Sequence, residues 1–314
     1  MAARGAYLAL SGLMALAGCD AFYTERLAPP PPAPAPAPEP PQRSADSLAL
    51  ERYYGRIESS LVSQGLLRTD GGGRDTPWDA EDLTRNFLRI ATFEEYNTLG
   101  EQIVQRQTES RIHRWETPVR LEVEFGETVS PVKQLKDTDA VRTLARRLAV
   151  ATGHPIRAVE GGGNFHILIV NEDERRALEP RLRELVPSIT DSAVNTITAL
   201  PRTSYCLVLA VTPRGDGVYT RAVAVIRGEH PDLLRLSCLH EEIAQGLGLS
   251  NDSPLARPSI FNDDEEFALL TSQDEAMLAI LYDERLDPGM TGDESAPIVE
   301  EIAAEITGDG PGGF

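Results

Sequence analysis

Hydrophobic positions recur along this chain with two spacings, one typical of helices and one typical of strands. Helices are expected over residues 46–66, from 76 onward, over 92–107 as a polar helix, over 138–151 and 172–186, from 231 onward and over 271–282. Strands are expected over residues 119–125, 156–159, 165–170, 205–211 and 218–226. The strand at 165–170 is almost entirely apolar, which is typical of a strand in the centre of a sheet.

The order of these elements predicts an α+β fold, in which a mixed sheet with packed helices follows a helical N-terminal region. The last two strands are joined through the sequence Pro-Arg-Gly-Asp-Gly at 213–217, which is typical of a hairpin turn. We expect the helical region to span residues 46–116 and the sheet domain to span residues 117–287. The tail over 288–314 is acidic and rich in glycine, and it is expected to be loose.

The first residues have the pattern of a secretory signal. One positive charge, Arg4, precedes an apolar run over 6–17 that is too short to span a membrane. The run ends in Leu-Ala-Gly-Cys at 16–19, which resembles a bacterial lipobox. The resemblance implies removal of residues 1–18 and lipidation of Cys19; an ordinary secretory signal is the alternative. Asp20 favours retention in the inner membrane, so we expect a lipid-anchored protein of the cell envelope that faces the periplasm.

A Pro-rich segment follows the expected anchor. Between residues 29 and 41 most positions are proline, alternating with alanine, and such a run favours the polyproline II conformation. At roughly 3.1 Å per residue it holds a domain about 40 Å from the membrane. Residues 19–45 are therefore expected to be a tether, with a docking site for a proline-binding partner as the alternative.

Charge and cysteine content narrow the class of protein. The formal net charge is −19, so the basic footprint of a nucleic-acid-binding protein is absent. The acidic run over 263–266 is interpreted as solvated surface. Three cysteines occur, and once Cys19 is lipidated, Cys206 and Cys238 remain. An even pair in an oxidising compartment predicts a disulfide, with two buried free thiols as the alternative.

Residues 241–251 carry the strongest chemical signal. Their sequence, Glu-Glu-Ile-Ala-Gln-Gly-Leu-Gly-Leu-Ser-Asn, resembles the metzincin zinc-peptidase motif HExxHxxGxxH. Glu242 stands at the position of the catalytic glutamate, and Gly248 stands at the position of the turn glycine. Glu241, Gln245 and Asn251 occupy the three positions of the zinc-binding histidines. Helical spacing lets the side chains of Glu241 and Gln245 reach one ion from one turn of helix.

The resemblance continues downstream of the motif. Matrixin-type metzincins follow the third histidine with a Ser-Ile-Met turn, and here Ser259, Ile260 and Phe261 occupy that turn. A helix that begins Leu-Thr follows at 270–271, as in those enzymes. The resemblance implies a zincin-like fold for the sheet domain. From residue 87 onward the chain also resembles a family of uncharacterised bacterial envelope proteins, mostly alphaproteobacterial.

The altered ligand set changes the expected chemistry. Zinc prefers histidine nitrogen and cysteine sulfur, whereas a glutamate with two amides offers oxygen, which suits calcium or magnesium better. We expect no cofactor in a degenerate cleft, a calcium or magnesium site as one alternative, and a metal-free hydrolase that uses Glu242 as general base as another. His240 has alanine four residues later, so no second ligand follows it, and a structural role is expected.

Three functions agree with these observations. A catalytically degenerate peptidase fold keeps the cleft and captures a peptide or an envelope protein, because zincins hold substrates as an added strand at a sheet edge. An active hydrolase centred on Glu242 is the second function. A purely structural envelope lipoprotein, attached to the membrane through Cys19, is the third.

Overall fold

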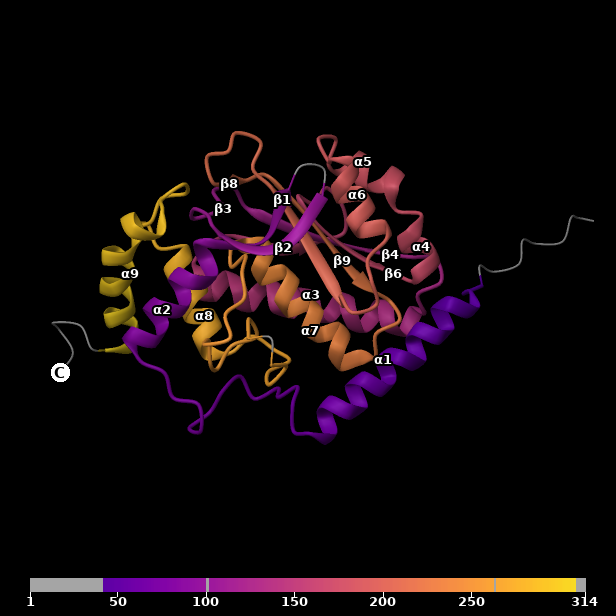
Figure 1. Cartoon of the computed structure of the whole chain (residues 1–314), viewed down its shortest axis with the longest axis horizontal. Helices are drawn as coiled ribbons and strands as arrows, with labels where there is room; N and C mark the ends of the chain where they lie inside the picture. Colours follow the sequence, from indigo (N-terminus) through magenta and orange to yellow (C-terminus); the bar gives the residue numbers. More distant parts are fainter. Residues whose placement is uncertain (1–41, 100–101, 263, 309–314) are drawn as a thin grey trace, which may run out of the picture. The chain divides into compact units, whose positions relative to one another are not determined.

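A five-stranded mixed sheet forms the centre of the described chain (Figure 1). Its strands follow the order β5-β4-β6-β9-β7, and every neighbouring pair is parallel except β7 with β9. Their bounds are Val119–Phe125 for β4, Ile156–Val159 for β5, Phe165–Val170 for β6, Cys206–Val211 for β7 and Arg221–Arg227 for β9. The antiparallel strand β7 is therefore one edge of this sheet.

This computed structural model describes residues 42–99, 102–262 and 264–308. The expected signal, Cys19 with its expected lipidation, and most of the expected tether lie outside the described residues. Within these three ranges, no helix is both long enough and apolar enough to cross a bilayer.

The pattern of apolar residues predicts the sheet well. Strands β4, β5 and β6 have the expected bounds, and all six residues of β6 are buried between its two neighbours. The expected hairpin is confirmed for β7 and β9, which pair from Cys206 opposite Ile226 to Val211 opposite Arg221. Between them lies β8 (Val218–Tyr219), which leaves the sheet and pairs in parallel with β3 (Arg114–Trp115).

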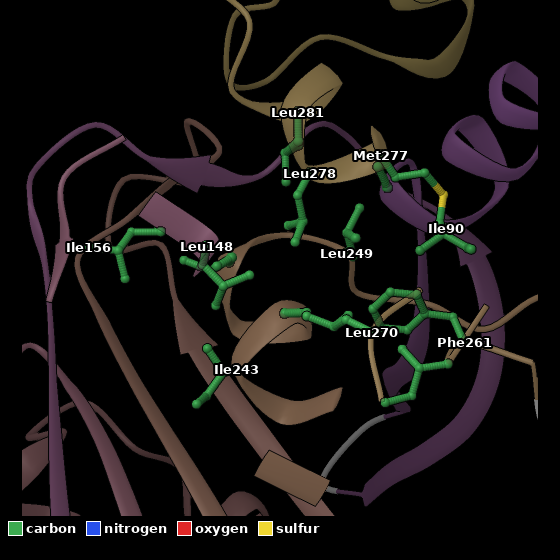
Figure 2. Close-up of a cluster of buried hydrophobic side chains, with 14 of the residues drawn as sticks. Ile90, Leu148, Ile156, Ile243, Leu249, Phe261, Leu270, Met277, Leu278 and Leu281 are labelled. Atoms are coloured by element: carbon green, nitrogen blue, oxygen red, sulfur yellow. The ribbon is translucent and has the colours of Figure 1, made fainter. Parts of the chain in front are cut away.

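Two helices, α3 (Pro131–Thr152) and α7 (Asp232–Leu247), cover one face of the sheet. Behind them pack α8 (Ser272–Leu281) and α2 (Ala80–Ala91). Figure 2 shows side chains of the main core from these helices, among them Ile243 of α7, Leu148 of α3 and Leu278 of α8. The main core joins the expected helical region to the sheet domain, so the two regions share one interior.

The opposite face of the sheet carries three short helices, α4 (Glu172–Arg176), α5 (Glu179–Leu185) and α6 (Asp191–Thr198). Their apolar residues form a second core with the side chains of β6, β7 and β9 that point to this face. The single helix expected over 172–186 is wrong, because the chain breaks at Ala177 and Leu178. A new helix begins there at Glu179 with Pro180 in its first turn, since a proline in a helix interior would remove one hydrogen bond and clash with the preceding turn.

The polar helix expected over 92–107 is also wrong. This segment forms a hairpin of β1 (Phe93–Leu99) and β2 (Gln102–Glu109), paired antiparallel. The sequence has no apolar stripe at helical spacing that would hold a helix against a core. Thr98, Ile103 and Val104 favour strands instead, because β-branched side chains fit the pleated surface of a sheet.

The expected loose tail contains a helix, α9 (Gly292–Thr307), packed against α2 (Figure 1). A capping box starts it, in which the Thr291 hydroxyl accepts from the Glu294 amide while the Glu294 carboxylate accepts from Thr291. Val299 and Ile302 bury the apolar side of α9. The acidic residues of the tail occupy the solvent-facing side of α9. The overall acidic composition therefore gave a wrong prediction of a loose segment.

The first helix, α1 (Ala45–Ser63), is confirmed, and the Ser44 side chain caps its N-terminus. Its polar contacts fix it to the sheet domain. The Ser47 hydroxyl donates to the Glu229 carboxylate at 2.6 Å, and the buried Tyr54 hydroxyl donates to the Arg202 carbonyl at 2.9 Å. These contacts position α1 beside the N-terminal end of α7.

Candidate functional site

Helix α7 carries the motif along one side of the main core. Leu239, Ile243 and Leu247 are buried in this core, as the sequence pattern predicts. Gly246 lets α7 lie close to the sheet, because a Cβ at this position would approach the Phe165 ring to 2.4 Å. Gly248 ends the helix at φ 128°, and a Cβ there would lie 2.0 Å from a backbone oxygen, so only glycine fits.

A cleft of about 370 Å³ opens between α7, the start of β7 and the loops that follow α7. Four carboxylates line this cleft, and no lysine, arginine or histidine is among its described lining residues. The carboxylates belong to Glu241 and Glu242 of α7 and to Asp252 and Glu265 of the loops. Glu242 is 97 % buried, as its relative exposure of 3 % shows. The cleft is therefore strongly acidic.

The Cys206–Cys238 disulfide lies in the wall of this cleft and confirms the predicted pairing. It links β7 to α7 across 6.0 Å between Cα atoms. The Cys206 sulfur and the carboxylates of Glu241 and Glu242 lie within 4.8 Å of one another. Because Cys206 is bonded to Cys238, its sulfur is not a thiolate ligand, and the cluster offers only carboxylate oxygen.

The three positions expected to bind metal do not all face the cleft. Glu241 and Gln245 line it, whereas Asn251 does not. The fully buried Asn251 side chain donates from Nδ2 to the Arg89 carbonyl oxygen at 3.0 Å. The next residue, Asp252, lines the cleft in its place. One carboxylate, one amide oxygen that is a weak zinc donor, and a third side chain that points elsewhere do not fit a zincin zinc centre.

His240 lies outside the cleft and has a structural contact. The Leu270 amide donates to His240 Nδ1 at 3.2 Å, which links α7 to the segment that leads into α8. Burial lowers the pKa of His240 to about 3, so the ring is neutral at ordinary pH. A second buried histidine, His166 of β6, also lies outside the cleft, and its Nδ1 is 3.0 Å from a Glu124 oxygen of the neighbouring strand β4.

The predicted turn at 259–261 is fixed to α8 by one carboxylate. Asp274 accepts hydrogen bonds from the Ser259 hydroxyl at 2.6 Å and from the Ile260 amide at 3.0 Å. It also accepts from the Thr271 amide, which completes the N-terminal cap of α8. Phe261 is fully buried in the main core. The turn thus supports the floor of the cleft, where Ile260 is a lining residue.

We expect the contribution of Asp274 to the stability of the folded protein to depend on pH. Complete burial raises the pKa of Asp274 from 3.8 to about 6, although its hydrogen bonds act in the opposite direction. A raised pKa means that the folded protein favours the protonated carboxyl. Its contribution to stability is therefore full below about pH 4 and is lost as the pH rises through 6. The loss corresponds to about 3 kcal/mol of unfolding free energy.

Urea unfolding of the wild type and of Asp274→Asn between pH 4 and pH 7 measures this effect. The unfolding free energy of the wild type minus that of the variant should fall as the pH rises, because asparagine does not titrate. Parallel stability curves for the two proteins would show that Asp274 keeps an ordinary pKa.

A second hollow of about 210 Å³ continues along β7 beyond the acidic cleft. Leu207 and Gln245 line both spaces, so the two are adjacent. The β7 wall of the second hollow is apolar over Leu207, Val208, Leu209 and Ala210. Its other lining residues are Glu94, His113, Thr212, Tyr219 and Ser250. The two hollows together follow the edge strand from its start to its end.

Comparison with protein families gives one match. A family model described as a protein of unknown function, DUF2927, matches residues 80–301. The chain belongs to this family. The DUF2927 region includes the whole sheet, the acidic cleft and most of α9, and it begins at the first residue of α2. No curated protein and no solved structure shows significant similarity to the chain.

The match confirms the expected membership of an uncharacterised family. It assigns no function to the DUF2927 region, so the zincin resemblance and the envelope location stay predictions. Sequence reasoning missed two carboxylates of the cleft, those of Asp252 and Glu265. Asp252 stands directly after the last motif position, which was its only signal. Glu265 lies in the acidic run over 263–266 that was interpreted as solvated surface.

Proposed function

We propose that this protein is a lipid-anchored envelope protein whose catalytically degenerate, zincin-like domain captures an extended peptide segment of a partner. The peptide adds to the sheet as a further strand beside β7. This open strand, which forms a wall of both hollows, is the observation that carries the proposal. The anchor at Cys19 and the Pro-rich tether would hold the capturing domain at a distance from the membrane.

The position of β7 in the sheet supports strand addition. Among the strands of the described chain, β7 pairs only with β9. Every second residue of an edge strand turns its amide and carbonyl groups away from the sheet, where they can pair with another chain. All six residues of β7 are half-buried, which leaves the strand accessible. Main-chain hydrogen bonds then supply affinity, and the hollows supply specificity.

The donor set of the motif supports binding rather than zinc proteolysis. Glu242 keeps the position of a catalytic base and lines the cleft. However, zinc hydrolysis needs three ligands that converge on one ion, and Asn251 turns away to the Arg89 carbonyl. The combination resembles a peptidase cleft that kept its substrate edge and lost its metal ligands.

Amide hydrogen exchange with a fluorescein-labelled random heptapeptide pool tests the proposal. The purified full-length protein should show slowed exchange at alternate amides of β7, because a paired strand protects every second amide of its neighbour. Protection confined to other elements would contradict strand addition. Cleavage of the pool that disappears in Glu242→Ala would favour the hydrolase alternative instead.

A further inference from the structure

Helix α1 is held to the rest of the described chain by few buried side chains. Of its 19 residues, only Ser47 and Tyr54 are buried. The helix also lies before the DUF2927 region, which begins at residue 80. A helix with so little buried surface opens at a low cost in free energy, because most helical stability comes from packing. Helix α1 is therefore suited to detach in a local opening of the structure.

One side chain of α1 completes the start of α7, the helix that forms a wall of the acidic cleft. Pro231, the N-cap residue of α7, makes no side-chain hydrogen bond to the first turn. The Glu58 carboxylate supplies this contact from α1, accepting from the Leu233 amide at 3.1 Å and from the Leu234 amide at 2.9 Å. A carboxylate is favourable there because the unpaired amides of a helix N-terminus carry partial positive charge. When α1 detaches, α7 loses this cap at a turn whose Leu234 lines the cleft.

A third core, separate from the two cores of the sheet, joins α1 to the walls of the cleft. Its buried residues are Tyr54, Leu67, Leu234 and Ala268. The Tyr54 ring lies edge-on to the ring of Tyr205, with 5.9 Å between the ring centroids. Tyr205 directly precedes β7, and it lines the cleft together with Leu234. Because close-packed side chains shift together, the position of α1 affects both walls.

The chain after α1 makes a strained junction with a loop of the cleft. The Leu67 amide donates to the Glu265 carbonyl at 2.8 Å, and the Arg68 amide donates to the Glu266 carbonyl at 2.7 Å. Leu67 and Glu265 have φ of 57° and 59°, and they are the only non-glycine residues of the described chain with positive φ. This conformation is uncommon for such residues and persists only where the surrounding structure enforces it. Glu265 and Phe267 line the cleft, so the strain lies where the segment after α1 meets it.

We infer that residues 45–68 form a strap whose docking holds the cleft in its peptide-binding conformation, and whose release lowers the affinity for peptide. This inference rests on the proposed function for its ligand and names the regulation of the same site. By linkage, a bound peptide strengthens the docking of the strap by the same factor. The Pro-rich segment over 29–41 lies just before the strap in the sequence, so tension on this segment, or a partner that binds it, acts on the strap first.

Amide hydrogen exchange of the full-length protein, without peptide, tests whether the strap and the cleft are coupled. Glu58→Ala removes the cap that α1 gives to α7, and a lost charged acceptor corresponds to about a tenfold change in the docking equilibrium. Exchange should therefore become about tenfold faster across α1. It should also become about tenfold faster at the amides of Leu67, Arg68 and Ala268, which pair across the junction, because the strap opens as one unit.

Asp46→Ala is the matched control on the same helix. It removes an equal charge and introduces the same alanine, but Asp46 is exposed and pairs with the exposed Arg176 of α4 at 3.3 Å. An exposed ion pair contributes little to docking, so exchange at the junction should change by less than about twofold. Thermal unfolding of each variant establishes that it is folded before exchange is compared.

The fluorescein-labelled random heptapeptide pool measures the coupling from the side of the ligand. At a concentration that protects β7 in the wild type, the pool should slow exchange at the Leu67, Arg68 and Ala268 amides by at least about fivefold, because it selects the docked strap. In Tyr54→Ala combined with Glu58→Ala, which removes both contacts of the strap with the start of α7, fluorescence anisotropy should show binding weakened by a similar factor. If this double variant does not fold, protection of the junction in the wild type decides.

The other outcomes separate the strap from the proposed function. Faster exchange in α1 alone, with the junction amides unchanged in Glu58→Ala, would show that α1 frays without affecting the cleft and would overturn the inference. A pool that protects β7 and leaves exchange at the junction unchanged would also overturn it, with strand addition left in place. Failure of the pool to protect β7, while the junction still responds to Glu58→Ala, would overturn the proposed function alone, and the coupling of strap and cleft would stand.

Discussion

Replacing Cys206 and Cys238 by alanine together should lower the free energy of unfolding by about 3 to 4 kcal/mol. The bridge closes a loop with a sequence separation of 32 residues, and opening a loop of that size restores a large conformational entropy to the unfolded chain. The bridge also joins β7 to α7, the two walls of the acidic cleft. We therefore expect the double variant to bind peptides more weakly as well.

Guanidinium unfolding of the double variant, of the wild type, and of the wild type treated with a phosphine reductant measures this effect. The reduced wild type should lose nearly as much stability as the double variant, because both lack the constraint. A loss below about 1 kcal/mol in both would show that the unfolded chain is already compact around these cysteines. A large loss in the variant alone would identify a packing defect at the buried Cys238 instead.

The sheet was the most predictable part of the fold. Its central strand, β6, is apolar except for His166 and is buried on both faces, and β4 alternates with a clear period of two. Both patterns reflect burial, because each buried position of a strand is occupied by an apolar residue that can be recognised in the sequence. The hairpin of β7 and β9 was predictable because glycine and proline mark its turn.

The wrong predictions fell where tertiary contacts outweigh local pattern. The β1–β2 hairpin has Gly100 as its only turn signal in the sequence, and its polar residues show no helical or strand period. Helix α9 has a narrow apolar side that gains stability only by packing on α2. The surfaces against which the β1–β2 hairpin and α9 pack belong to other parts of the chain, so a local stretch of sequence does not reveal them.

The candidate site was predictable to the extent that it lies on one helix. Glu241, Glu242 and Gln245 share a side of α7, so helical spacing alone brings them to the cleft. The position of Asn251 depends on the path of the chain after Gly248. Its side-chain amide donates to the Arg89 carbonyl and does not line the cleft. Glu265 reaches the cleft from a loop, and no periodicity applies to such a segment.

A buried ion pair holds α7 against α3 and gives the second large expected effect. Arg235 of α7 contacts both oxygens of Asp137 on α3, at 2.7 and 2.9 Å from Nε. The two side chains are only 1 % and 5 % exposed. Arg235 also donates to the His230 carbonyl at 2.7 Å, which ties the pair to the start of α7.

Asp137→Ala should destabilise the protein by about 3 to 5 kcal/mol, because it leaves the Arg235 charge buried without its main counterion. Asp139→Ala is the matched control on the same helix, since Asp139 is exposed and pairs with the exposed Arg142 at 3.4 Å. The control should cost less than about 0.5 kcal/mol. Urea unfolding of both variants measures the two effects.

Replacing both partners distinguishes an unpaired charge from a simple loss of packing. Asp137→Leu with Arg235→Met removes both charges and keeps most of the buried volume. We expect this double variant to recover most of the stability lost in Asp137→Ala, because desolvating the pair offsets much of its attraction. If the double variant is as unstable as the single one, the hydrogen bonds from Arg235 to the His230 carbonyl and to Asp232 are the essential contacts. In that case the start of α7, rather than the ion pair, controls the position of the cleft.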